Sequence, residues 1–151
     1  MRIGLGADHA GVELKDRIKR ALGDRGVDYE DLGTDSDQRV DYPDYARRVG
    51  EGVASGVFDR GILCCGSGIG MAIAANKISG VRAAPVSDVE TARLSREHND
   101  ANVLALAART LDADAALAIV DAFLTTSFAG GRHQRRLDKI ASMEHQEAPT
   151  L

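Results

Sequence analysis

The stretch Ile62-Leu-Cys-Cys-Gly-Ser-Gly-Ile-Gly-Met71 contains a short apolar run followed by closely spaced glycines, and small residues continue to Asn76-Lys77. This order is typical of a buried strand that passes through a glycine-rich turn into a helix. Cys65 and Ser67 stand in the turn, where converging main-chain N–H groups and the helix dipole favour negative charge. The stretch therefore predicts a strand–turn–helix unit with room for an anion or a reactive thiol.

Short apolar strands and amphipathic helices alternate on both sides of this unit. We predict strands at 2–7, 27–32, 60–65, 81–86 and 103–107. Helices are expected at 11–24, from 41 onward, at 70–76, from 87 onward, at 113–124 and from 132 to about 145. This alternation predicts an α/β fold, a three-layer α/β/α sandwich around a Rossmann-like, five-stranded parallel sheet. The second strand is the most polar, which favours an edge position.

Helix starts and buried faces can also be predicted from particular residues. Asp41 is a plausible N-cap with Pro43 in the first turn, and Ser87 with Glu90 has capping-box spacing. The helix at 113–124 is expected to bury Leu117, Val120 and Leu124.

The composition limits what the protein can do. The chain has 151 residues, 44% hydrophobic and 28% charged, which suits one domain spanning 1–151. A net charge of −4 and 4% aromatic residues argue against nucleic-acid binding. No apolar run approaches the roughly 20 residues that span a bilayer, and no secretion signal is evident, so we expect no membrane contact and a cytoplasmic location. The adjacent cysteines suit neither a disulfide framework nor a metal site.

Most residues with reactive or charged side chains follow predicted strands. Asp8-His9 follows the first strand, Cys65–Gly70 the third, Ser87-Asp88 the fourth and Arg109 the fifth. Because the carboxyl ends of parallel strands share one sheet edge, where ligands bind, we expect a site there. Cys65 has two readings at this point: a small buried hydrophobe, or a thiolate favoured by the helix N-terminus.

Other candidates lie later in the chain, and each also has an ordinary structural explanation. His98 is either a helix-terminal residue or a general acid–base group, with Asn99 beside it. Arg132 and Arg136 share a helical face and are either solvated or bind an anion. The turn after Cys65 lacks the lysine of a P-loop, and the glycines near the start do not complete a dinucleotide motif.

Several segments in order resemble the ribose-5-phosphate isomerase type B family, whose wider group includes galactose-6-phosphate isomerase subunits. The segments are Gly6-Ala-Asp-His9, Asp41-Tyr-Pro43, Cys65-Gly-Ser-Gly68, Ala74-Ala-Asn-Lys77, Ser95-Arg-Glu-His-Asn-Asp100 and Gly130-Gly-Arg-His-Gln134. The resemblance implies interconversion of ribose 5-phosphate and ribulose 5-phosphate, a step of the pentose phosphate pathway, without a metal or organic cofactor.

Residue roles follow from the resemblance. It implies that Cys65 is the base that moves a proton between C2 and C1 through an enediolate, that Ser67 assists proton movement between the oxygens, and that His98 helps to open the furanose ring. The implied substrate-binding set is Asp8, His9, Gly66, Ser67, Gly68, Ile69, Gly70, Asn99, Arg109, Arg132 and Arg136, of which His9 and the arginines hold the phosphate. Met71 stands where family members without the cysteine carry a glutamate base, so the chain resembles the cysteine branch.

The resemblance also implies a homodimer or homotetramer with shared active sites, the histidine–asparagine segment reaching into the neighbour's site. The C-terminal helix, at about 132–145, is expected at the subunit interface. A tetrulose 4-phosphate, allose 6-phosphate or galactose 6-phosphate remains possible as substrate, and so does a non-catalytic sugar-phosphate-binding module. A thiol redox protein is disfavoured, because adjacent Cys64 is a poor resolving partner.

Overall fold

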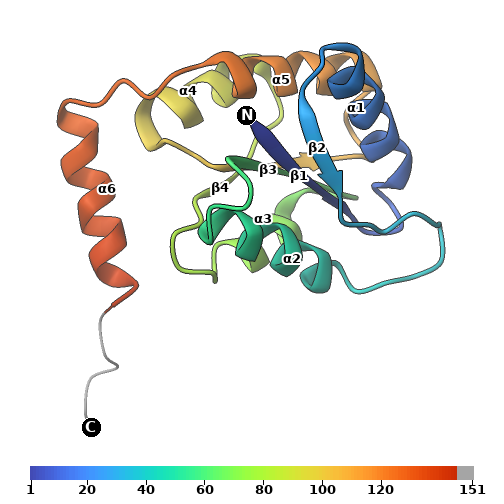
Figure 1. Cartoon of the computed structure of the whole chain (residues 1–151), viewed down its shortest axis with the longest axis horizontal. Helices are drawn as coiled ribbons and strands as arrows, with labels where there is room; N and C mark the ends of the chain where they lie inside the picture. The colour runs from blue at the N-terminus through green and yellow to red at the C-terminus, as the bar shows by residue number, and fades with distance from the viewer. Residues whose placement is uncertain (146–151) are drawn as a thin grey trace, which may run out of the picture.

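The computed structural model describes residues 1–145; residues 146–151 of the predicted domain lie outside it. Five parallel strands form one sheet in the spatial order β2-β1-β3-β5-β4 (Figure 1). Their bounds are β1 (Arg2–Ala7), β2 (Asp28–Asp31), β3 (Arg60–Cys65), β4 (Ala83–Pro85) and β5 (Val103–Ala107). The polar β2 is an edge strand, as predicted.

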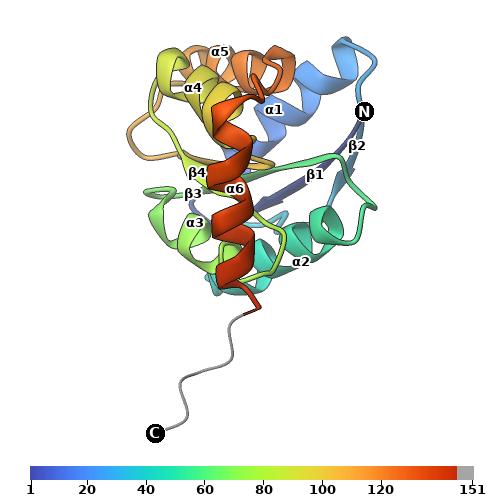
Figure 2. The same ribbon diagram turned by 90° about the vertical axis from the view of Figure 1, so that its left-hand side faces the viewer.

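Helices cover both faces of the sheet. One face carries α1 (Val12–Asp24), α4 (Val89–Asn99) and α5 (Ala113–Thr125), and the other carries α2 (Tyr42–Ala54) and α3 (Ile69–Ala75) (Figure 2). Each layer buries its own hydrophobic cluster. Successive residues of a strand face opposite layers, so Cys64 belongs to the cluster under α1 and α5 and Cys65 to the one under α2 and α3. The predicted three-layer α/β/α fold is confirmed.

Helix α6 (Arg132–Met143) lies apart from these layers and crosses the β4 edge of the sheet (Figures 1 and 2). Its upper end places His133 against α4, and its lower end is held by Glu144, which accepts hydrogen bonds from Ser79 Oγ at 2.8 Å and Gly80 N at 3.0 Å. Ile140 and Met143 remain 43% and 65% exposed. Within residues 1–145 the helix therefore leaves apolar side chains exposed.

Two local predictions were wrong. The N-cap of α4 is Asp88, whose carboxylate accepts from Thr91 N at 2.7 Å, so the helix begins one residue later than a Ser87 cap would require. In α5 Leu117 and Leu124 are only half-buried, because the helix is rotated on the sheet from the expected face. The buried stripe consists of Ala116, Ile119, Val120 and Phe123. In α2, Val49 and Val53 are buried and Tyr45 is half-buried.

A buried ion pair fastens α1 to the β2 edge of the sheet. Lys15, only 1% exposed, donates to Asp31 Oδ1 at 2.5 Å, while the partly exposed Lys19 donates to Oδ2 at 3.0 Å. Burial opposes ionisation of this carboxyl group, but hydrogen bonds from Lys15, Gly33 N and Lys19 outweigh it and lower the pKa of Asp31. Among the ion pairs of residues 1–145, the Lys15–Asp31 pair has the least exposed side chains.

We expect Asp31→Asn to destabilise the protein by about 3 kcal/mol, because it leaves a buried ammonium group without a counter-charge. Lys19→Met, which removes the exposed partner, should cost about 1 kcal/mol or less. Since the folded-state pKa of Asp31 is lowered, its contribution is complete above the unfolded-state pKa of about 4 and is lost as the pH falls through the folded-state value. Urea unfolding at pH 7 and pH 3 measures both effects; an equal cost at the two pH values would contradict the assignment.

Candidate active site

The strand order reverses between β1 and β3, since the chain moves from β1 outward to β2 and then across to β3. Parallel α/β sheets leave a crevice at the carboxyl ends of such strands. Asp8 and Cys65 flank this point, and Asp8 N donates to Cys64 O at 3.2 Å across it. The topology therefore brings the ends of the first and third strands together, as the sequence predicts.

Cys65 is the last residue of β3, and its side chain is 4% exposed. Its sulphur accepts a hydrogen bond from Gly68 N at 3.1 Å, which fixes the direction of the side chain at the start of the turn. Cys64 faces the opposite layer, where burial above all raises the pKa of its thiol. Only one of the two adjacent thiols is thus placed for chemistry at the sheet edge.

The turn after Cys65 lies beneath a cation. A side chain at Gly66 would collide with the guanidinium of Arg109, whose Nη1 would lie 2.8 Å from its Cβ. The main chain of Arg109 is held beside the turn, because its backbone N–H donates to Gly66 O at 3.1 Å. Gly68 has a φ of 75°, in the left-handed region, and its α-carbon packs on the main chain of β5. A side chain at Gly66 would therefore displace the Arg109 guanidinium, whereas Gly68 requires glycine because of its φ and its contact with the main chain.

Ser67 and Ile69 are exposed at the mouth of the turn, and Ser67 Oγ accepts from Ile69 N at 3.2 Å. Tyr42, at the start of α2, lies directly against Gly70, where a Cβ would approach the phenol ring to 2.6 Å. In the sequence this tyrosine belongs to a predicted helix start and to a segment of the family resemblance, and neither assigns it to the site. Its signal was the Asp41-Tyr-Pro43 segment, but only the fold shows that it faces the glycine turn.

Asp8 is buried at the end of β1, and its Oδ1 accepts from Ala10 N at 3.0 Å and Gly11 N at 3.2 Å. These bonds hold one carboxylate oxygen in the turn before α1 and fix the direction of the other. His9 is half-buried, and its Nδ1 accepts from Val40 N at 3.3 Å. The protonated nitrogen of a neutral ring is then Nε2, a donor available to an anion.

His98 and Asn99 lie at the other edge of the sheet. They end α4 and precede the amino end of β5, whereas Cys65 pairs with Ala107 at the carboxyl end of that strand. From Val103 to Ala107 the strand alone covers roughly 13 Å. Within one chain the structure therefore does not bring this histidine to Cys65.

The ring of His98 stacks on His133 of α6, with centroids 4.4 Å apart and planes 16° from parallel. Burial, followed by the neighbouring positive charges of His98, Arg132 and Arg136, lowers the pKa of His133. His133 is not predictable as a site residue from the sequence, since a histidine within a basic helix start gives no signal of its contact. The stack links α6, with its exposed arginines, to the end of α4.

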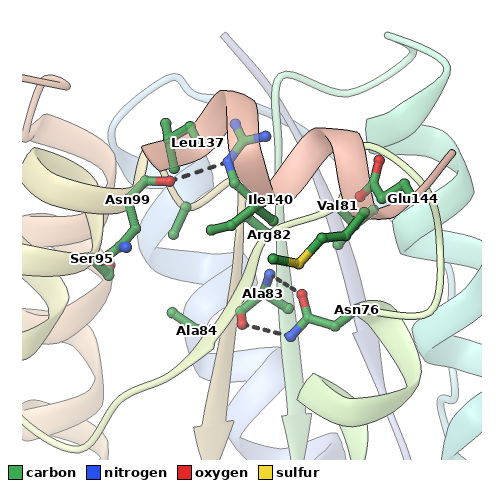
Figure 3. Close-up of a pocket in the computed structure, with 12 residues that line it drawn as sticks. Asn76, Val81, Arg82, Ala83, Ala84, Ser95, Asn99, Leu137, Ile140 and Glu144 are labelled. Carbon is green, nitrogen blue, oxygen red and sulfur yellow. Dashed lines mark hydrogen bonds between the residues drawn. The ribbon is translucent and has the colours of Figure 1, made fainter. Parts of the chain in front are cut away.

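A groove of about 450 Å³ runs between α6, α4 and the β4 edge (Figure 3). Ser95 and Asn99 line one side, and Leu137 and Ile140 of α6 line the other. Asn76 forms its floor by pairing with the free edge of β4 through Ala83 N and O, at 2.8 and 2.9 Å. This contact explains the asparagine of the 74–77 segment as a cover for an edge strand.

The predicted site residues thus form two groups. Asp8, His9, the 65–70 turn and Arg109 meet at the carboxyl edge of the sheet, whereas His98, Asn99, Arg132 and Arg136 belong to the end of α4 and to α6. Within residues 1–145 no three or more histidine, cysteine or acidic side chains are arranged to hold a metal ion. In the same part of the chain no helix has the length and apolar character needed to cross a membrane.

Known proteins resemble this chain in fold and in sequence. The chain matches the ribose/galactose isomerase family over residues 3–140. It is 48% identical to ribose-5-phosphate isomerase B of Escherichia coli, covering 96% of this chain and 97% of that protein. A structure of ribose-5-phosphate isomerase B from Clostridium thermocellum superimposes with a TM-score of 0.94, at 51% identity over 95% of this chain and 97% of the other.

A further structure, ribose-5-phosphate isomerase B from Mycoplasma genitalium with bound ribulose-5-phosphate, matches with a TM-score of 0.93. It is 43% identical, over 97% of each chain. The chain described here belongs to the ribose/galactose isomerase family. The resemblance seen in the sequence segments is confirmed over nearly the whole length.

Proposed function

We propose that this protein is a cofactor-free isomerase that interconverts ribose 5-phosphate and ribulose 5-phosphate. The observation that carries the proposal is the Cys65 thiol, buried at the strand-order reversal with a main-chain N–H on its sulphur and Arg109 over the adjoining turn. The names of the Escherichia coli and Clostridium relatives, and the ribulose-5-phosphate bound to the Mycoplasma protein, support this substrate over other sugar phosphates.

The reaction needs one base and one polarised oxygen. In the proposed mechanism the Cys65 thiolate removes the proton from C2 of the open-chain aldose, the electrons form the C1–C2 double bond, and the carbonyl oxygen at C1 becomes an enediolate oxygen. Return of the same proton from the thiol to C1 gives the ketose, while Ser67 passes the hydroxyl proton from O2 to O1. Main-chain N–H groups of the 66–70 turn stabilise the charge that develops on oxygen.

The proposed phosphate site draws on cations from both groups of residues. Arg109 is already held over Gly66, and His9 lies beside Asp8 on the same edge. Arg132 and Arg136 are exposed on α6, and neither forms an ion pair within residues 1–145. Charge-assisted bonds to the phosphate would orient a small substrate whose reacting carbons lie at the other end.

We further propose a homodimer, or a tetramer built from such dimers, in which each site combines Cys65 of one chain with His98 and Asn99 of the next. The separation of these residues within one chain supports sharing, because ring opening and proton transfer must occur on the same substrate. The exposed Ile140 and Met143 and the adjoining groove support α6 as part of the interface. Two free cysteines fit a reducing compartment such as the cytoplasm.

A direct assay tests the proposed activity. The purified protein, with a chelator present, is incubated with ribose 5-phosphate, a four-carbon sugar phosphate, allose 6-phosphate and galactose 6-phosphate, and ketose or aldose formation is followed. We expect ribose 5-phosphate to be converted with the highest kcat/KM. Faster conversion of another sugar would change the assigned substrate, and no conversion of any of them would leave only a binding module.

A further inference from the structure

A second cluster of positive charge lies at the amino edge of the sheet, away from the proposed catalytic centre. A cavity of about 570 Å³ there is lined by Arg60, Arg82 and Arg96, together with Asp59 and Asp100. Arg60 is the first residue of β3 and Cys65 the last, so the strand separates the two places by roughly 17 Å. None of the three arginines belongs to the residues assigned to the isomerase reaction.

Main-chain carbonyl groups hold these guanidinium groups in place. Arg60 donates to Phe123 O at 2.5 Å, and Arg96 donates to Thr126 O at 3.2 Å and Ala101 O at 2.5 Å. Arg82 donates to the carbonyl oxygens of Asn99 and Asp100, both at 3.1 Å. A carbonyl oxygen fixes the direction of a guanidinium group but does not neutralise its charge. These carbonyl contacts therefore position the three guanidinium groups and leave their positive charges in place.

The ring of Phe123 brings two of the charges together. The guanidinium carbons of Arg60 and Arg96 lie 5.5 and 5.8 Å from the centre of this fully buried ring. Burial above all, and then repulsion by the positive charge of Arg96, lowers the pKa of Arg60 to about 10. Arg60 is still protonated at neutral pH, and the repulsion is energy that a bound anion would relieve.

Carboxylates neutralise the cluster only in part. Asp100 pairs with Arg96 at 2.8 Å and with Arg82 at 3.5 Å, and Arg60 has no ion pair within residues 1–145. Asp59 faces the same cavity, but its Oδ2 accepts from Arg2 N at 2.6 Å. In that part of the chain the hydrogen bonds leave Nη2 of Arg60, Nη1 of Arg82 and Nη2 of Arg96 without an acceptor. Three donors on three separate guanidinium groups thus remain available around one cavity.

We propose that this cavity is a second anion-binding site, which takes a small phosphate-bearing anion of two or more negative charges at a place distinct from the substrate site. Guanidinium groups suit phosphate because they can donate two parallel N–H bonds. The cavity is large enough for a diphosphate group but is lined mainly by polar side chains, so charge rather than apolar contact selects the ligand.

Inorganic pyrophosphate is the probe for the test, and calorimetric titration is the measurement. The titration is made in Arg109→Gln, which weakens phosphate binding at the proposed catalytic centre. We expect Arg60→Gln in this background to bind pyrophosphate at least about tenfold more weakly, because it removes a charged donor. Arg47→Gln is the matched control, since Arg47 is an exposed arginine of α2 whose one ion pair within residues 1–145 is with Glu51. Its affinity should equal that of the parent.

Misfolding of Arg60→Gln would also weaken pyrophosphate binding, so a variant expected to bind more tightly is tested as well. Asp59→Asn keeps an oxygen for Arg2 N but removes a negative charge from the cavity, so we expect binding about two- to fivefold tighter. Adenosine diphosphate, titrated in parallel, separates recognition of the free diphosphate from recognition of its ester: binding equal to that of pyrophosphate supports the diphosphate group as the whole determinant. Unchanged affinity in both Arg60→Gln and Asp59→Asn, or no pyrophosphate binding once Arg109 is replaced, would overturn the proposal.

Discussion

Cys65→Ala is expected to lower kcat for ribose 5-phosphate by about a thousandfold while KM changes little. Loss of a positioned base removes an interaction used in the transition state, and such a group contributes 10²–10⁴-fold. The sugar and phosphate contacts proposed for Asp8, His9 and Arg109 remain, so substrate binding should persist. Steady-state kinetics with thermal unfolding of the same preparation measures both quantities. Turnover close to that of the wild type would remove Cys65 as the base.

Cys64→Ala is the matched control for this experiment. The two thiols are adjacent, but Cys64 faces the cluster under α1 and α5, and burial raises the pKa of its thiol. The control should therefore retain its kcat and lose about 1 kcal/mol of stability from the small cavity that it creates. A fall in kcat equal to that of Cys65→Ala would indicate that damage to β3, not loss of the base, explains both variants.

The main features of this fold are predictable from local sequence because its signals are local. Buried strands of a parallel sheet are continuous apolar runs, and β1, β3 and β5 occupy the ranges predicted from those runs. The wrong predictions concern the N-cap of α4 and the buried face of α5, where a shift of one residue changes the outcome. Ser87 and Asp88 are both good caps, and only the path of the chain out of β4 selects Asp88. The rotation of α5 depends on packing against the sheet, which periodicity does not specify.

The same distinction between local and long-range information applies to the residues of the site. Residues that directly follow strands, such as Asp8 and Cys65, can be placed at one edge from the strand pattern alone. The contact of Tyr42 with Gly70 and the stack of His98 on His133 join segments far apart in sequence. No periodicity or motif spacing encodes those contacts. They depend on how α2 and α6 cross the sheet.

His98 and Cys65 lie apart within one chain, so we expect activity to depend on both chains of a dimer. His98→Asn should lower kcat by about a hundredfold or more, because the proposed ring-opening group is lost. Cys65→Ala and His98→Asn chains, co-expressed with different affinity tags, should nevertheless regain activity. If a site takes Cys65 from one chain and His98 from the other, each hybrid dimer contains one site with both residues intact. Random pairing then restores about a quarter of the wild-type activity.

A site built from Cys65 and His98 of the same chain predicts a different recovery of activity. If both residues served the same site within one chain, every site in the mixture would carry one substitution, and no activity would return. A mixture of Cys65→Ala with Asp8→Asn supplies the control, because Asp8 and Cys65 lie at the same edge of one chain and hybrids contain no intact site. Recovery in the first mixture and not in the second is the expected result. Absence of recovery in both would indicate that Cys65 and His98 serve the site of the same chain and would overturn the shared arrangement.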